Sequence, residues 1–206
     1  MGKPPAAKSR PQKGAAQESE PVARKPRADA ERNRQRLIEA AKTSFAQSGA
    51  ATTLEEVARE AGVGIGTLYR HFPTREALVE QVYREALGRL AADAERLIKE
   101  QPPVEALRQW LLLFVDYIAT KKLMHDLLAT VAGGAAALYA QTKSQLEAAA
   151  ASLVDRAKES GEIKREVAPF DLLFALAGLA YVGPPSDWQP RARQMVDILI
   201  AGIKRA

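Results

Sequence analysis

The chain has 206 residues, of which 47% are hydrophobic and 27% charged, with no cysteine and two histidines. This length allows a small domain beside a larger one, or one elongated helical body, and either can bury a sizeable core. Without cysteine the chain has neither a disulfide framework nor a thiolate metal site. His71 and His125 lie far apart in the sequence, so we expect no metal site and no cofactor.

Membrane and export signals are not evident in the sequence. The start of the chain lacks an apolar signal core, and no run of 18 or more apolar residues occurs. We therefore expect a cytoplasmic protein that has no membrane partner.

The net charge of +5 is concentrated in the amino-terminal part. Residues 1–36 hold ten Lys or Arg and four Asp or Glu, whereas the remaining residues hold twenty and twenty-one. Residues 1–27 also carry five of the twelve prolines, which predicts a disordered basic arm. Such an arm suggests contact with phosphates or a minor groove, although a solvated tail is the alternative, and we prefer that alternative for residues 1–20.

Apolar residues recur at helical spacing from Ala28 onward, and Gly or Pro separates the segments. This pattern predicts an all-α protein with an amino-terminal domain over residues 28–76 and a helical carboxy-terminal domain over residues 77–206. The predicted helices are Ala28–Ser48, Leu54–Ala61, Ile65–Phe72, Thr74–Glu100, Val104–Lys121, Leu123–Val131, Ala135–Ser160, Phe170–Val182 and Arg191–Lys204. Lys121 and Lys122 lie near a helix end, where the dipole favours cations.

The stretch from Thr52 to Phe72, TTLEEVAREAGVGIGTLYRHF, has the pattern of a helix-turn-helix. Thr53 and Glu56 have the spacing of a capping box, and Gly62 can adopt the left-handed backbone that ends a helix. A nucleotide-binding loop is the alternative for the three glycines, but it lacks a preceding strand and the third glycine at the required spacing. The second helix then turns Thr67, Tyr69, Arg70 and His71 outward, where they can reach phosphates or base edges in a major groove.

Residues Thr53–Leu78, with GVGIGTLYRHFPTREAL at their core, resemble the DNA-binding signature of the TetR family of bacterial regulators. The resemblance covers about residues 29–80 and rests on helix order and length beyond them. It implies a homodimeric repressor that binds double-stranded DNA at a near-palindromic operator and releases it on binding a small-molecule inducer. The residues expected at DNA are Arg24, Lys25, Arg27, Thr53, Gly66, Thr67, Tyr69, Arg70, His71 and Arg75.

Aromatic and flexible apolar residues of the carboxy-terminal domain are typical of a small-molecule pocket, although ordinary core packing is the alternative for each of them. The resemblance implies an inducer pocket between the central helices. The candidate pocket residues are Trp110, Phe114, Tyr117, Met124, His125, Leu128, Tyr139 and Phe174.

The segment Phe170–Val182 is apolar nearly all round, so a helix here needs a second partner besides its own domain, most simply another subunit. The resemblance implies that the last two helices of each subunit pack into a four-helix interface. The candidate interface residues are Leu172, Leu176, Leu179, Leu199 and Ile203.

Two other functional classes are conceivable. A helical enzyme would need a catalytic constellation, and we identify none in the sequence, which lacks a nucleophile elbow. A scaffold protein would not need outward-facing Thr67, Tyr69 and His71 beside a basic arm. We therefore expect a DNA-binding regulator and no enzyme.

Overall fold

The computed structural model describes residues 1–2, 25–131, 134–163, 166–182 and 187–204, with residues 25–27, 134–139, 141 and 142 described by their backbone only. The prediction of an all-α fold is confirmed. The helices of the described part are α1 (Lys25–Ser48), the 3₁₀ helix η1 (Gly49–Ala51), α2 (Leu54–Glu60), α3 (Ile65–His71), α4 (Arg75–Glu100), α5 (Pro103–Leu123), α6 (His125–Ala129), α7 (Gly134–Glu159), α8 (Pro169–Val182) and α9 (Trp188–Ile203).

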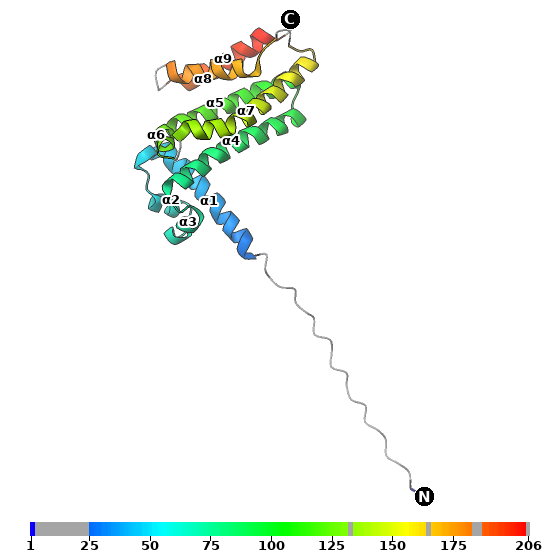
Figure 1. Ribbon diagram of the computed structural model, residues 1–206. Coiled ribbons are helices and arrows are strands. Elements are labelled where there is room, and N and C mark those ends of the chain that lie inside the picture. Colours follow the sequence, from blue (N-terminus) through cyan, green and yellow to red (C-terminus); the bar gives the residue numbers. More distant parts are fainter. Residues whose placement is uncertain (3–24, 132–133, 164–165, 183–186, 205–206) are drawn as a thin grey trace.

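The helices are arranged in three tiers (Figure 1). The first tier is a small bundle in which α2 and α3 pack against α1. The second tier contains α4, α5 and α7, which pack on one another, and α8 and α9 form the third tier against α5. The tier of α8 and α9 and the bundle of α1–α3 lie at opposite ends of the molecule (Figure 1).

Helix α4 connects the first tier to the second. The hydroxyl of Thr74 caps it by accepting a hydrogen bond from the Ala77 amide at 3.1 Å. The helix has 26 residues and is therefore about 40 Å long. Its buried side runs from Leu78 to Leu97, so one continuous apolar stripe packs against both the first and the second tier.

Several helix ends differ from those predicted. Helix α1 begins at Lys25, three residues earlier than predicted, because Pro26 in the first turn removes no intrahelical hydrogen bond. Helix α5 includes Pro103 for the same reason. Helix α9 begins at Trp188 in place of Arg191, and the buried Trp188 side chain packs into the core.

Helix α6 is shorter than predicted, at five residues. The predicted loop of residues 162–168 contains an isolated β-bridge between Ile163 and Lys204, which ties the described carboxy-terminal end to the loop after α7. Among the helices that the structure describes, none combines the length and the apolar character needed to cross a bilayer.

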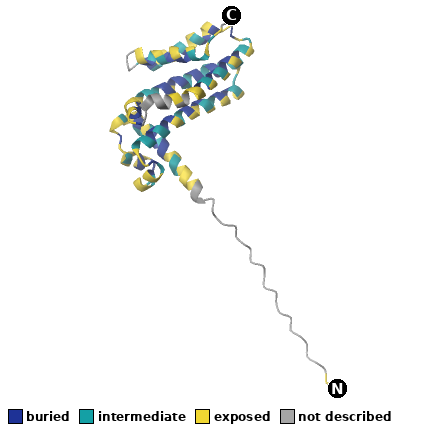
Figure 2. Ribbon diagram, in the orientation of Figure 1, coloured by how far each residue is buried: buried dark blue, intermediate teal, exposed yellow. Residues whose placement is uncertain are grey.

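Buried residues run through all three tiers (Figure 2), and Trp110 of α5 is the largest of the fully buried side chains in the described part of the chain. The Trp110 side chain is fully buried, and its indole N–H donates a hydrogen bond to the Leu90 carbonyl of α4 at 2.8 Å. A buried indole needs such a partner. This contact fixes α5 against the middle of α4.

Candidate functional sites

Helix α2 begins with a complete capping box. The Thr53 hydroxyl accepts from the Glu56 amide at 3.2 Å, and the Glu56 carboxylate accepts from the Thr53 amide at 2.8 Å. The hydrogen bond that the Thr53 amide donates to the Glu56 carboxylate lowers the pKa of Glu56, and the Thr53 hydroxyl near the same carboxylate lowers it further. The Thr53 side chain, predicted to contact DNA, thus has a local structural role as the cap of α2.

The turn between α2 and α3 depends on Gly62, whose φ of 62° lies in the left-handed region. Its amide bonds to the Arg59 carbonyl at 3.0 Å, and the next amide, of Val63, bonds back to the Ala58 carbonyl at 3.0 Å. These bonds satisfy carbonyls at the end of α2. The guanidinium of Arg36 from α1 also donates to the Gly62 carbonyl at 3.4 Å, which ties the turn to α1.

Helix α3 has one buried and one open side, as predicted. Leu68 and Phe72 are buried, whereas Tyr69 is 46% exposed and Arg70 is exposed. Thr67 and His71 are half-buried at the borders of the open side. Helix α3 has seven residues in about two turns, so the polar residues of its open side lie close together.

Arg70 is already ordered along the surface of α3. Its Nε donates to the Gly66 carbonyl at 3.1 Å, and one terminal nitrogen donates to the Thr67 hydroxyl at 3.1 Å. A guanidinium carries five N–H donors, so donors remain for a phosphate or a base edge after these two bonds. Gly66 itself is exposed, and a Cβ placed on it would meet no atom within 4 Å.

Arg75 lies at the start of α4 and is tied to the loop before α2. One of its terminal nitrogens donates to the Thr52 carbonyl and the other donates to the Ala50 carbonyl at 2.9 Å. Its guanidinium also lies over the Phe45 ring, 5.4 Å from the centroid. These contacts account for a half-buried Arg75 without DNA and give it a role in holding η1 against α4.

The basic residues of the predicted arm remain untested. Arg24 lies outside the described residues, and Lys25 and Arg27 belong to the first turn of α1, where only the backbone is described. The prediction that these side chains contact DNA therefore stays a prediction.

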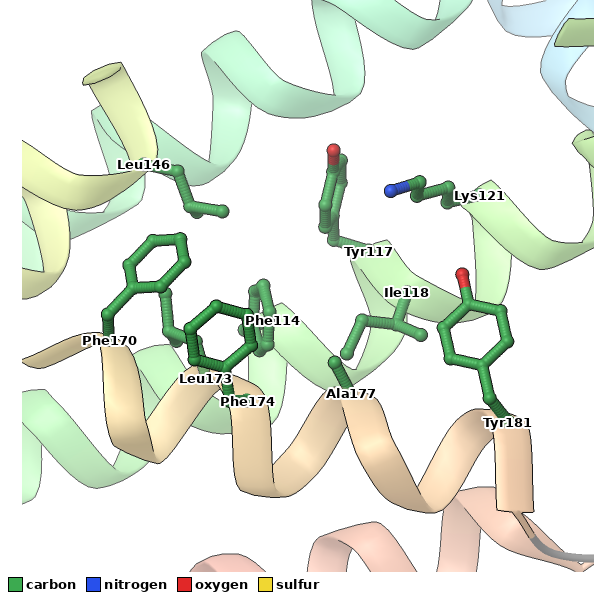
Figure 3. Close-up of a pocket in the computed structure, with 10 residues that line it drawn as sticks. All are labelled: Phe114, Tyr117, Ile118, Lys121, Leu146, Phe170, Leu173, Phe174, Ala177 and Tyr181. Carbon is green, nitrogen blue, oxygen red and sulfur yellow. The ribbon is translucent and has the colours of Figure 1, made fainter. Parts of the chain in front are cut away.

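A pocket opens between α5, α7 and α8 in the body (Figure 3). The cavity volume is about 80 Å³, and all of its empty space together, open solvent included, is about 470 Å³. Seven of its ten lining residues have purely apolar side chains, and the other three are Tyr117, Lys121 and Tyr181. The lining residues are Phe114, Tyr117, Ile118, Lys121, Leu146, Phe170, Leu173, Phe174, Ala177 and Tyr181.

Three predicted pocket residues, Phe114, Tyr117 and Phe174, line this pocket. Trp110 is buried behind it and stacks on Phe114, with 6.1 Å between the ring centroids. The other predicted residues lie elsewhere: Met124 and Leu128 are buried near α6, and His125 is exposed. The side chain of Tyr139 lies outside the described part of the chain.

The lining residues that sequence reasoning missed follow a regular pattern. On α5 they lie three or four residues apart from Phe114 to Lys121, and on α8 they do so from Phe170 to Tyr181. Residues at this spacing share one face of a helix. The signal was therefore a pair of aromatic stripes, one on each helix, that face each other.

The polar groups of the pocket gather at one end. The Lys121 amine and the hydroxyls of Tyr117 and Tyr181 lie at the end away from Phe170 (Figure 3). The Tyr117 hydroxyl is 2.8 Å from that of Tyr83 on α4, with which it forms a buried hydrogen bond. Burial lowers the pKa of Lys121 because the apolar surroundings disfavour its charged form.

Comparison with known proteins gives the same architecture. The model for bacterial regulatory proteins of the tetR family matches residues 37–82, and that for the carboxy-terminal domain of SbtR-like transcriptional regulators matches residues 102–205. The crystal structure of a TetR transcriptional regulator from Streptomyces coelicolor is 39% identical, covers 84% of this chain and 99% of its own, and superposes with a TM-score of 0.76. The chain belongs to the TetR family.

Other TetR relatives agree with this assignment over different lengths. A TetR transcription regulatory protein from Mycobacterium vanbaalenii is 30% identical, with 87% of this chain and 99% of that chain covered and a TM-score of 0.72. The probable acrEF/envCD operon repressor of Escherichia coli is 34% identical over 101 residues, which are 48% of this chain and 46% of that protein. This chain thus spans about half the length of that curated relative. TetR-family proteins are transcriptional regulators and not enzymes.

Helices α8 and α9 of this TetR-family chain have many exposed residues (Figure 2), and some of these have large apolar side chains. On α8, Phe174 and Tyr181 are each 62% exposed and Val182 is 88% exposed, and on α9 Ile198 is 55% exposed. The apolar character of α8 on every side, noted in the sequence, therefore persists as uncovered surface in the single chain.

The residues predicted for a subunit interface divide into two groups. Leu172, Leu176 and Ile203 are buried within their own subunit, which leaves them little surface for a partner. Leu179 and Leu199 are half-buried and pack on the edge of the core. The subunit interface stays a prediction, and its candidates are Leu179 and Leu199, with exposed Ile198 beside Leu199 on α9.

Proposed function

We propose that the protein is a ligand-responsive repressor that binds double-stranded DNA as a homodimer and releases its operator when a small molecule enters the pocket. The observation that carries the DNA-binding part is the open side of α3, where Tyr69 and an ordered Arg70 project from a helix whose inner side is buried. A recognition helix held in this way can enter a major groove.

The rigid support of α3 favours DNA reading over a merely exposed helix. The capping box of α2, the Gly62 turn and the Arg36 contact fix the orientation of α3 relative to α1. Base recognition requires side chains placed to within hydrogen-bond geometry, and a rigid helix supplies that placement. Thr67 and Arg70 are the candidates for base edges, and Tyr69 and His71 for phosphates.

A homodimer would explain the exposed apolar side chains of α8 and α9. Contiguous exposed apolar surface on a soluble chain marks an interaction site, and a twofold axis uses the same surface on both subunits. Two recognition helices in such a dimer would contact half-sites one helical turn apart, about 34–36 Å, on a near-palindromic operator.

The response to a small molecule is supported by the pocket between α5, α7 and α8. It is lined mainly by apolar and aromatic side chains and has a small number of polar groups, as ligand sites do. A ligand shifts the DNA-binding equilibrium only if its affinity differs between the DNA-bound and released states. Tilting of α4, which contacts both α1 and α5, would change the spacing of the recognition helices.

Selection of bound fragments from a genomic DNA library tests the DNA-binding part. We expect enrichment of fragments with two inverted half-sites, and a footprint on both. An Arg70→Ala variant should lose the enrichment, whereas Arg96→Ala at the far, exposed end of α4 is the matched control that should keep it. Recovery of fragments without any shared sequence would contradict the proposal, as would a chain that stays monomeric in light scattering at micromolar concentration.

A further inference from the structure

We infer that the ligand of the pocket is a small, flat, uncharged aromatic molecule, held between the aromatic side chains of α5 and those of α8. This inference rests on the proposed function only in taking the pocket as a ligand site. It goes further because it states the chemical class of the ligand and the contacts that select it.

The lining of the pocket is rich in aromatic side chains. The whole chain has five Phe, five Tyr and two Trp among its 206 residues, which is 6%. Five of the ten described lining residues are aromatic, namely Phe114, Tyr117, Phe170, Phe174 and Tyr181. A lining that merely continued the core would follow the composition of the core, where aliphatic side chains predominate. The enrichment therefore favours recognition of aromatic rings.

The aromatic rings come from two helices that face each other across the pocket. In Figure 3 the side chains of Phe170, Phe174 and Tyr181 point from α8 toward α5. On α5, Phe114 stacks with Tyr117, with 6.0 Å between the ring centroids and 27° between the ring planes. On α8, Phe170 and Phe174 meet edge to face, with 4.7 Å between their centroids. Aromatic pairs prefer these two arrangements, and a flat ring between the helices can make both kinds of contact.

The size of the pocket limits the ligand to a thin molecule. Its cavity volume is about 80 Å³, whereas an apolar cavity of about 150 Å³ in a protein core holds benzene. Phe174 and Tyr181 are each 62% exposed, so their rings can turn outward without disrupting a packed core. Such a movement enlarges the pocket on its open side. A single flat ring can then enter, whereas a bulkier molecule of the same length would need the buried side of the pocket to move.

The lining offers little to a charged ligand. No Asp or Glu is among the described lining residues, and seven of the ten have purely apolar side chains. Lys121 already interacts within the protein, as does Tyr117, whose hydroxyl is 2.8 Å from that of Tyr83. A charged group that moves from water onto apolar side chains loses hydration, which costs free energy. An uncharged ligand avoids this cost and needs no protein group that is already engaged.

Calorimetric titration of the full chain at neutral pH with matched probes tests the inference. The probes are benzyl alcohol, cyclohexylmethanol and benzoate, together with their homologues 2-phenylethanol, 2-cyclohexylethanol and phenylacetate. The cyclohexyl alcohols have the larger apolar surface, so burial of apolar area alone favours them. We expect the aromatic alcohols to bind about two- to tenfold more tightly than the cyclohexyl alcohols, which is the gain from one aromatic pair. They should also bind at least about tenfold more tightly than the aromatic acids, whose charge must lose hydration.

Variants of Phe174 locate the effect. Phe174→Leu keeps an apolar side chain and removes the ring, so most of the preference for the aromatic over the cyclohexyl alcohols should be lost. Phe174→Tyr keeps the ring and is the matched control that should retain the preference. Phe174 is exposed, so neither change should unfold the chain, and light scattering shows whether the assembly has changed. If Phe174→Leu alters the assembly, Phe170→Leu replaces it.

Three results would overturn the inference. The first is equal or tighter binding of the cyclohexyl alcohols or of the acids to the unmodified protein. The second is an unchanged preference in the leucine variant, which would assign the exposed Phe174 ring to the subunit interface alone. The third is the failure of every probe to bind at millimolar concentration.

Gel-shift titrations of the same samples separate this inference from the proposed function. Aromatic alcohols that bind through Phe174 but leave the DNA complex intact would support the ligand class and contradict induction. Intact DNA binding by a protein that binds none of the probes would overturn the ligand class and leave the DNA-binding regulator standing.

Discussion

Arg75 has two competing interpretations, a contact with DNA or a role in holding the amino-terminal bundle together. The sequence places it beside the recognition helix and predicts a DNA contact, whereas the structure ties its guanidinium to the carbonyls of Ala50 and Thr52 and to the Phe45 ring. We expect Arg75→Met to destabilise the amino-terminal bundle, because methionine retains most of the apolar stem and removes every hydrogen bond.

The size of the effect follows from the three contacts. Thr52 is 1% exposed, so its carbonyl would lose a charge-assisted bond worth about 1.5–3 kcal/mol with little chance of replacement by water. Ala50 is exposed, and water can take over its carbonyl at small cost. Loss of the cation from the Phe45 ring adds about 0.5–1 kcal/mol. We therefore expect destabilisation of about 2–4 kcal/mol for the unfolding that includes this bundle.

Urea unfolding followed by far-ultraviolet circular dichroism, at one protein concentration for all variants, measures this change. The stability of Arg75→Lys should lie between that of Arg75→Met and that of the unmodified protein, since an ammonium cannot reach both carbonyls as the planar guanidinium does. Arg96→Met, which removes exposed ion pairs with Asp93 and Glu100, is the control and should change stability far less. An Arg75→Met protein as stable as the unmodified one, with weakened DNA binding, would refute the structural role and restore the DNA contact.

Three further predictions concern the other parts of the molecule. Arg70→Ala should relax sequence preference at a cost of about 1–3 kcal/mol on the best operator, whereas Tyr69→Phe should weaken binding to all sequences alike, and gel-shift titrations against matched and scrambled DNA would show this. Ile198→Glu, on the exposed side of α9, should give folded monomers in light scattering, whereas Leu176→Glu, fully buried within its own subunit, should unfold the chain; a dimeric Ile198→Glu protein would place the interface elsewhere. Because folding lowers the pKa of Glu56, its ionised carboxylate stabilises the folded protein above the ordinary pKa of 4.5, and this stabilisation is lost as the pH falls through the pKa of the folded state. Unfolding titrations below pH 4.5 should therefore show a smaller loss of stability for a Glu56→Gln protein than for the unmodified one.

The bundle of α1–α3 was predictable because local rules act there without competition. The spacing of Thr53 and Glu56 specifies a capping box from nearby residues alone, and the structure contains it. Gly62 was predicted to take a left-handed backbone, and its φ is 62°. Each of these features depends on contacts within a few residues, which a sequence shows directly.

The pocket was only partly predictable because helical periodicity identifies a face and not what covers it. The side chains of α8 are apolar nearly all round, so the pattern alone does not separate core, pocket and interface positions: Phe174 was predicted to line the pocket, whereas Leu173, which also lines it, was not. Lys121 shows the same limit. The sequence predicts that Lys121 and Lys122 interact favourably with the dipole at the end of their helix. In the structure, Lys121 lines the pocket and Lys122 donates to the Ala180 carbonyl. The carbonyl that Lys122 contacts belongs to α8, 58 residues later in the chain.

The position of α4 explains how one chain can join a pocket to a DNA-binding bundle. Its Tyr83 bonds to Tyr117 in the pocket wall, and nearly two helical turns further on Arg89 pairs with Glu39 of α1. A helix is stiff because of its backbone hydrogen bonds, so a displacement at one point is transmitted along its length. The exposed ion pair between Arg89 and Glu39 contributes little to the free energy of folding. The buried stripe of α4, shared by the two tiers, therefore makes a larger contribution to holding α1 in position than the ion pair does. A ligand that displaced the Tyr117 hydroxyl would act on α4 from its buried side, where packing is dense and a small shift cannot be absorbed locally.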